Sequence, residues 1–442
     1  MTWMFQNSGR VIKISKNPDN WMLAIAFLIP AFFLVLKSVA NIGLFLVFFI
    51  SCWAISKEPR EYLVKRGAQF WVMAACLLSP FLAELLAQFG RGHLIAPSLD
   101  GPSRAILAVA IFVYLSKKYC GDLILALRLG SGFGIVLLVA YLLIFPEDYW
   151  GSRAATYFVD PITLPCFAVV LLGMFLFGRL PKISKPLEII FKFSITMLTV
   201  YVAVESSSRS SWVAGFILLE AFILYSFRHS FRKQLVANLF LLAGAIALFQ
   251  MSAVVSTRAL EAVYGLVDFF NYGEGQDTSS VQRVLMVLID IELLRQSPFL
   301  GTQDGVMPAF EYLKSMIPNL DRGTYTIKTL AGSHSELFAQ LVRKGIFLGG
   351  FTLWGYFVYP MFLVFRKNRS ASSSFIDPRG VLLGLVLPVL MSGLTIQVFN
   401  LKMTTSFYLF CMTILLAYIF QENEAHRGRL KADIEPSRIF NW

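Results

Sequence analysis

Long apolar segments recur along the chain and constrain its fold more than any other feature. Twelve can be counted, with approximate bounds of 21–36, 39–55, 70–87, 103–116, 130–146, 162–178, 187–204, 211–227, 235–251, 345–365, 380–398 and 403–420. A transmembrane helix needs about 20 mostly apolar residues to cross the bilayer core. Only 15% of the 442 residues are charged, whereas an ordinary soluble domain contains about 25%. The sequence therefore predicts an all-α polytopic membrane protein with about 12 transmembrane helices, and it excludes soluble and disordered chains.

Lys and Arg cluster in every second connection between the apolar segments. The clusters lie near residues 10–16, 57–66, 117–128, 179–185, 228–233, 366–379 and 427–438. The short loops between them carry only one or two basic residues each. This alternation follows the positive-inside rule and predicts that both termini are cytoplasmic. It also explains the net charge of +12 by topology, so no nucleic-acid partner is expected.

One predicted outer loop is much longer than the others. The predicted organisation is nine helices in 1–251, the large outer loop in 252–344, three helices in 345–420 and a cytoplasmic tail in 421–442. Apolar residues at helical spacing predict an amphipathic helix that starts near residue 278 and ends before Pro298, and a second over 306–317. We therefore expect the large loop to form a cap of amphipathic helices at the membrane surface.

Three arginines in segments predicted to lie on the outer side are candidate site residues, and two of them, Arg209 and Arg153, stand in short outer loops, where basic residues are disfavoured. Arg209, in SSSRSSW, is expected at the N-terminus of a helix, where free backbone N–H groups and the helix dipole attract anions. The alternative is an interfacial arginine paired with Glu205, four residues earlier. By local pattern alone, Arg283 fits the solvated face of an amphipathic helix, and Arg153 fits an interfacial anchor.

His334 is the most informative of the four histidines. Ser333 and Glu336 have the spacing of a capping box, which predicts that His334 lies in the first turn of a helix. There the helix dipole keeps the imidazole neutral, so that it can accept a proton from a hydroxyl. Glu336 is expected to cap the helix, or to orient or replace the histidine. A single histidine in a loop is nevertheless more often incidental than catalytic.

Metal-binding and nucleotide-binding patterns are missing from the sequence. The outer loops contain no cluster of His, Cys or paired Asp suited to a metal ion. The five cysteines have neither CxxC spacing nor the pattern of a disulfide framework. We therefore expect neither a metal ion nor a cofactor.

The ordered motifs resemble those of the O-antigen ligase and polymerase family. They are SSSRSSW, an arginine-containing helix followed by SPFLGTQDG, and a histidine ahead of LVRKGIFLGG. GSRAATYFVDP is also similar to an upstream arginine motif of that family. Ser335 is a departure, because many members have Asn after the histidine. The resemblance implies a membrane glycosyltransferase of the GT-C type with its active face in the periplasm of a bacterial inner membrane.

The resemblance also implies a reaction and roles for the candidate residues. The donor would be an O-antigen glycan on undecaprenyl diphosphate, and the acceptor a sugar hydroxyl of lipid A–core. Arg209, Arg283 and Arg153 would bind the diphosphate, and His334 would accept the proton or align the hydroxyl. Two related activities remain as alternatives, namely those of an O-antigen polymerase and of a protein O-oligosaccharyltransferase. A transporter or lipid flippase is the alternative of a different class, and it should keep its functional polar groups near the bilayer midplane.

Overall fold

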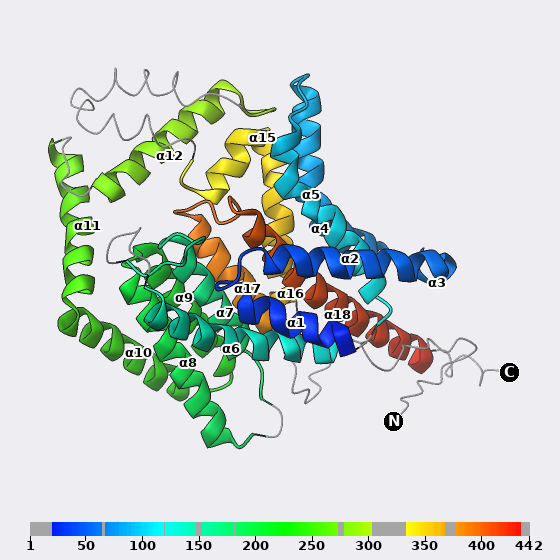
Figure 1. The fold of residues 1–442 in the computed structure, drawn as a ribbon, viewed down its shortest axis with the longest axis horizontal. Coiled ribbons are helices and arrows are strands. Elements are labelled where there is room, and N and C mark those ends of the chain that lie inside the picture. The colour runs from blue at the N-terminus through cyan, green and yellow to red at the C-terminus, as the bar shows by residue number, and fades with distance from the viewer. Residues whose placement is uncertain are drawn as a thin grey trace.

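The structure is a computed structural model that describes residues 20–63, 67–118, 120–146, 153–180, 183–272, 278–302, 333–366 and 377–434. Within these ranges, all regular secondary structure is helical (Figure 1). The helices are α1 (Asn20–Phe32), α2 (Val39–Lys57), α3 (Pro59–Leu63), α4 (Ala68–Gly90), α5 (Ala96–Leu115), α6 (Gly121–Ile144), α7 (Thr163–Leu176), α8 (Lys185–Glu205), α9 (Arg209–Ser226), α10 (Phe231–Met251), α11 (Ala253–Tyr272), α12 (Thr278–Gln296), α15 (Glu336–Leu353), the π-helical η2 (Trp354–Val358), α16 (Tyr359–Phe365), α17 (Pro378–Gly393) and α18 (Lys402–Ile434).

Eight helical segments of the described chain are long and apolar enough to cross a membrane. They are α2, α4, α5, α6, α8, α10, the continuous segment Glu336–Phe365 and the first part of α18. Three further apolar helices, α1, α7 and α17, are shorter. This confirms the prediction of an all-helical, multi-pass membrane protein. Each of the twelve predicted segments coincides with a helix, while the number that crosses the bilayer stays a prediction.

The centre of the bundle is built around α7 and α17. All 14 residues of α7 are buried, and the two helices cross where glycine faces glycine. A Cβ atom on Gly173 would lie 2.1 Å from the carbonyl oxygen of Gly384. Small residues allow helix backbones to approach closely in membrane proteins. In contrast, α10 has no buried residue and therefore lies at the edge of the bundle.

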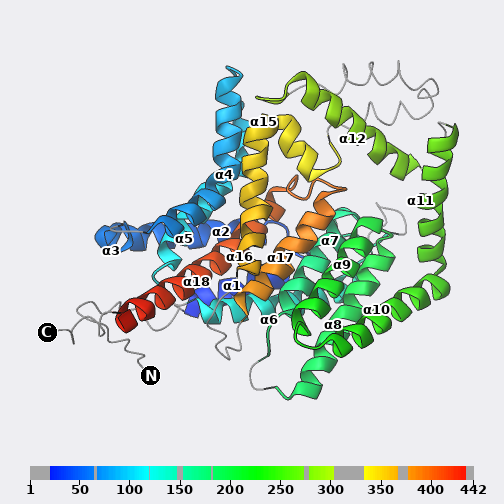
Figure 2. The same cartoon turned by 180° about the vertical axis from the view of Figure 1, so that it is seen from behind.

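Helices α10, α11 and α12 form an arm along one edge of the molecule (Figures 1 and 2). The arm leaves the bundle at α10, and α12 returns to pack against α15. The extent of α12 confirms the predicted amphipathic helix that ends before Pro298. The preceding helix α11 was not predicted, and the second predicted helix over 306–317 lies outside the described residues.

Three helix boundaries differ from the sequence prediction. α5 begins at Ala96, because Pro97 occupies its first turn, where proline is well tolerated. α6 begins at Gly121 and so contains Arg128, which is fully buried and donates a 2.9 Å hydrogen bond to the carbonyl oxygen of Arg179. α18 continues to Ile434, so that the first part of the predicted tail is helical.

Contacts between distant segments fall into two groups that follow the alternation of basic loops. Segments predicted to be outside contact one another through the pairs Lys402–Asp100, Arg91–Leu300, Arg153–Ser206 and Gln397–Ser333. Segments predicted to be inside do so through Gln421–Leu115, Arg379–Glu422 and Tyr225–Asp377. Arg153 and Ser333, the residue before His334, belong to the first group.

Candidate functional site

Arg209 is the first residue of α9 and follows a tight turn after α8. Ser207 in this turn has a φ of 52°, in the left-handed region that non-glycine residues seldom adopt. The hydroxyl of Ser211 donates a 2.7 Å hydrogen bond to the carbonyl oxygen of Ser208 and stabilises the start of α9. This turn places the guanidinium of Arg209 at the helix N-terminus, as the sequence predicted.

The guanidinium of Arg209 points to the arm. It donates a 2.7 Å hydrogen bond to the hydroxyl of Ser280 on α12, and it lies 3.9 Å from the carboxylate of Glu261 on α11. Glu261 also pairs with Arg258 on α11, at 3.5 Å. These contacts join α9 to α11 and α12 of the arm. The alternative prediction was a local pair with Glu205.

Arg153 lies against the turn between α8 and α9. Its Nε atom donates a 2.8 Å hydrogen bond to the carbonyl oxygen of Ser206. Burial lowers the pKa of the Arg153 guanidinium, and the positive charges of Arg258 and Arg283 lower it further, while the carboxylate of Asp160 acts in the opposite direction. Arg258 and Arg283 are therefore both close enough to repel the guanidinium of Arg153. Such a concentration of positive charge is suited to bind an anion.

The segment around His334 is held from both sides. The hydroxyl of Ser333 donates a 2.6 Å hydrogen bond to the carboxylate of Asp290 on α12. The hydroxyl of Ser335 donates a 3.0 Å hydrogen bond to the carbonyl oxygen of Gly393 at the end of α17. Burial lowers the pKa of His334, and the positive charge of Arg283 lowers it further. The imidazole is therefore neutral at neutral pH, and it lies within electrostatic reach of Arg283.

The predicted capping role of Glu336 is wrong. α15 begins at Glu336 itself, so His334 precedes the first turn, and the N-cap residue Ser335 makes no side-chain cap. The backbone N–H of Glu336 donates to the carbonyl oxygen of Ile396 (3.1 Å), and its buried carboxylate accepts a 3.1 Å hydrogen bond from the backbone N–H of Phe399. The backbone of the loop after α17 therefore provides the hydrogen-bond partners of Glu336 in place of a capping box.

Three residues at the site were not predicted from the sequence. Arg258 adds a fourth guanidinium to the cluster, Asp290 holds Ser333, and the side-chain amide of Gln397 donates to the carbonyl oxygen of Ser333. The only sequence signal for Arg258 was its spacing of three residues from Glu261, which is typical of an ion pair on one face of a helix. Asp290 and Gln397 are connected to Ser333 across 43 and 64 residues of chain, and no local pattern indicates such contacts.

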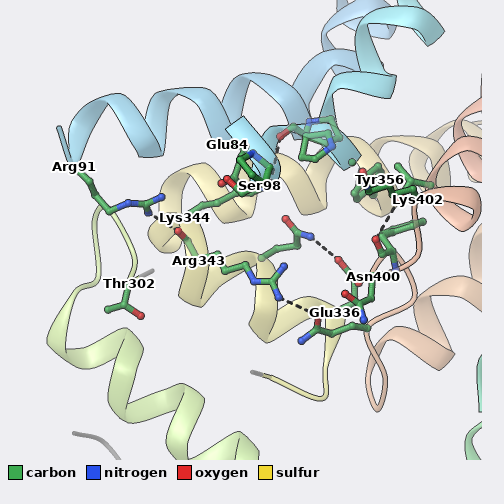
Figure 3. A pocket seen from close by; sticks show the side chains of 18 residues that line it. Glu84, Arg91, Ser98, Thr302, Glu336, Arg343, Lys344, Tyr356, Asn400 and Lys402 are labelled. Carbon is green, nitrogen blue, oxygen red and sulfur yellow. Dashed lines mark hydrogen bonds and ion pairs between the residues drawn. The ribbon is translucent and has the colours of Figure 1, made fainter. Parts of the chain in front are cut away.

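A cavity of about 410 Å³ lies next to the His334 segment. The C-terminal part of α4, the start of α5, α15 and the loop before α18 surround it (Figure 3). Its lining includes the cations Arg91, Arg343, Lys344 and Lys402 and the carboxylates Glu84 and Glu336. The described residues contain no group of three or more His, Cys, Asp or Glu side chains that could hold a metal ion.

No protein-family model matches this chain, and no curated protein is significantly similar to it. The resemblance to the O-antigen ligase and polymerase family therefore rests on the ordered motifs around Arg153, Arg209, Arg283 and His334. Chemically, the arrangement can bind an anionic leaving group beside a neutral base.

Proposed function

We propose that this protein is a metal-independent, inverting glycosyltransferase of the GT-C type with twelve transmembrane helices. It transfers O-antigen from undecaprenyl diphosphate to a sugar hydroxyl of lipid A–core. The reaction takes place on the periplasmic face of the bacterial inner membrane, with both termini in the cytoplasm. The observation that carries this proposal is that α12, which bears Arg283, contacts both Arg209 and Ser333, the residue before His334. It supports a site in which Arg283 lies near both the leaving group and the base.

The residues have separate tasks in the proposed reaction. His334 accepts the proton of the acceptor hydroxyl, whose oxygen attacks the anomeric carbon from the face opposite the diphosphate. The bond between that carbon and the diphosphate oxygen breaks, and the configuration of the linkage inverts. Negative charge develops on the departing diphosphate, and Arg209 and Arg283 stabilise it there. Guanidinium groups suit this task because they donate two parallel hydrogen bonds to phosphate oxygens.

The position of the charges favours an enzyme over a transporter or flippase. Arg209 is the first residue of its helix, and Arg283 lies on the arm, whose helix α12 is not among the candidate spans. A transporter would instead place its functional polar groups near the bilayer midplane, at broken helices. The O-antigen polymerase and the protein O-oligosaccharyltransferase use the same donor, so only the acceptor separates them from the proposed ligase.

An acceptor comparison tests the proposal. Purified protein would be supplied with undecaprenyl-diphosphate glycan and, in separate reactions, with lipid A–core, with a second undecaprenyl-diphosphate glycan, or with a serine- and threonine-containing peptide. We expect glycan-modified lipid A–core to form at least tenfold faster than the other products, about 1.4 kcal/mol of discrimination. Preferential elongation of the donor would identify a polymerase, and a glycosylated peptide would identify a protein glycosyltransferase.

A further inference from the structure

The cavity beside His334 contains two arginines without a carboxylate partner (Figure 3). Its lysines are paired, since Lys344 lies 3.6 Å from Glu84 and Lys402 forms an ion pair with Asp100. The two arginines instead donate hydrogen bonds to neutral oxygens. Nη1 of Arg91 donates to the carbonyl oxygens of Leu300 (2.7 Å) and Arg343 (2.6 Å). Nη2 of Arg343 donates a 3.1 Å hydrogen bond to the side-chain oxygen of Gln397.

Among the described residues, neither arginine has a carboxylate within ion-pair distance. The carboxylates of Asp290 and Glu336 are within electrostatic reach of Arg343, but neither forms an ion pair with it. Glu336 also lines the cavity, and its carboxylate is held by the amide of Gln340 and by the backbone of Phe399. Arg343 is exposed at the cavity and can still donate to a ligand. Such guanidinium groups are suited to bind a phosphate or a carboxylate.

Gln340 and Glu336 both belong to the cavity lining. Gln340 is only 9% exposed, and its NH₂ group donates to the carboxylate of Glu336. This hydrogen bond, together with the one from the backbone N–H of Phe399, fixes the position of the Glu336 carboxylate in the cavity wall.

Gln397 connects the cavity to the base. Its side-chain oxygen accepts from Arg343, and its NH₂ group donates to the carbonyl oxygen of Ser333, the residue before His334. Glu336, two residues after His334, forms part of the cavity wall. A ligand bound against Arg343 is therefore next to the segment that carries the imidazole. The arginines proposed to bind the donor lie elsewhere, on α9, α12 and the segment before α7.

We propose that this cavity binds the acidic head group of the acceptor glycolipid. Arg343, with Arg91 beside it, binds a phosphate or carboxylate of that head group. A sugar hydroxyl of the same head group then extends to His334. This assignment rests on the proposed function, in which His334 activates the acceptor.

The variant Arg343→Gln tests the assignment by kinetics. The residue is exposed, so its replacement should leave the fold intact. We expect the apparent KM for lipid A–core to rise about 10- to 100-fold, the loss typical of a charged hydrogen bond, while the KM for the donor stays unchanged. Arg343→Lys should recover part of the loss, because lysine keeps the charge. Arg295→Gln is the matched control, as Arg295 is an exposed arginine on α12 outside the cavity lining. An unchanged acceptor KM, or a raised donor KM, would contradict the assignment.

A binding measurement separates failure of this assignment from failure of the proposed function. Wild type and Arg343→Gln would be titrated in nanodiscs, without donor, with lipid A–core, with its dephosphorylated form and with its carboxyl-methylated form. Weaker binding of one modified form identifies the anion, and the Arg343→Gln variant should lose that discrimination. This pattern would support the cavity assignment even if wild type transferred no glycan. Equal binding of all three forms by wild type would overturn the assignment even if transfer occurred.

Discussion

The guanidinium of Arg209 donates a 2.7 Å hydrogen bond to the hydroxyl of Ser280, three residues before Arg283 on α12. This contact attaches the arm to the N-terminus of α9 and brings two arginines from distant parts of the sequence to the same site. Asp290 on the same helix accepts a hydrogen bond from Ser333, the residue before His334, so α12 connects Arg209 to the histidine segment.

Loss of either Arg209 or Arg283 should greatly reduce transfer without unfolding the protein. Each contributes a charged contact to the departing diphosphate, and removing one such donor typically lowers the rate about 10²- to 10³-fold. The measurement is the initial rate of lipid A–core modification by Arg209→Ala and Arg283→Ala. Lysine substitutions should recover only part of the rate, because lysine lacks the two-pronged geometry.

Arg295→Ala provides a matched control on the same helix. Its side chain is 72% exposed, so activity should stay within about twofold of wild type, as for most exposed surface substitutions. Full activity of both Arg209→Ala and Arg283→Ala would show that these arginines do not stabilise the departing diphosphate.

Gly345 should be indispensable for the shape of the acceptor cavity. Its φ of 79° lies in the left-handed region, and a Cβ atom there would lie 2.1 Å from the carbonyl oxygen of Phe299. The turn over 298–301 thus packs directly against the kink in α15. We expect Gly345→Ala to destabilise the protein by at least about 1–3 kcal/mol from backbone strain alone.

Thermal unfolding in detergent measures this effect, and Gly350→Ala is the control. No atom lies within 4 Å of a Cβ built on Gly350, and alanine is the better helix former, so its unfolding temperature should be equal or higher. Equal stability of Gly345→Ala and wild type would show that the turn is not fixed against α15.

Asp290 should make stability depend on pH in a defined direction. Burial raises the pKa of this carboxyl to about 6, although the hydrogen bond from Ser333 and the charge of Arg343 act in the opposite sense. A carboxyl group whose folded pKa exceeds its unfolded value of about 3.9 contributes stability below that unfolded value and loses it as pH rises through the folded pKa.

Relative to Asp290→Asn, wild type should therefore become less stable between about pH 4 and pH 6 and change little at higher pH. Thermal unfolding of both proteins across this range measures the difference. The asparagine variant keeps an acceptor for Ser333, so the comparison isolates ionisation. Parallel pH profiles for the two proteins would show that Asp290 is not the group responsible.

The transfer activity of the protein should fall only in acid, when His334 becomes protonated. Burial and the charge of Arg283 lower its pKa below the usual value of about 6.5, and the neutral imidazole is the form that accepts a proton. The transfer rate should therefore fall as pH decreases through this lowered pKa. In Arg283→Gln, the acid limb of kcat/KM should move to higher pH, because the repelling charge is gone. An acid limb above pH 6.5 in wild type would contradict a neutral, buried base.

The sequence and the structure agree where local patterns determine the result. The apolar segments predicted most of the helices, and the start of a helix at Arg209 and the end of α12 before Pro298 were predicted from short motifs. The sequence placed Arg209, Arg283 and His334 as candidates, but not their relation to each other. That relation depends on α11 and α12 of the arm, and α11 was missed because Arg258, Glu261 and Asp268 interrupt its apolar residues.

The acceptor cavity could not have been predicted in the same way. Its residues come from α4, α5, α15 and the loop before α18. The role of Glu336 was predicted wrongly because a capping box is a local pattern, whereas the actual partners of Glu336 are the backbone groups of Ile396 and Phe399. Contacts across such sequence distances depend on tertiary packing.

The rate of glycan transfer by purified protein in EDTA, for wild type and His334→Ala, tests the central claim most directly. We predict that wild type forms glycan-modified lipid A–core from the undecaprenyl-diphosphate donor without added nucleotide or metal. His334→Ala should be about 10²- to 10⁴-fold slower but bind the donor equally well, since the arginines remain. His93→Ala replaces an exposed histidine in the loop after α4 and should match wild type. A wild-type protein that forms no modified lipid A–core, or a His334→Ala variant that transfers at the wild-type rate, would contradict the account.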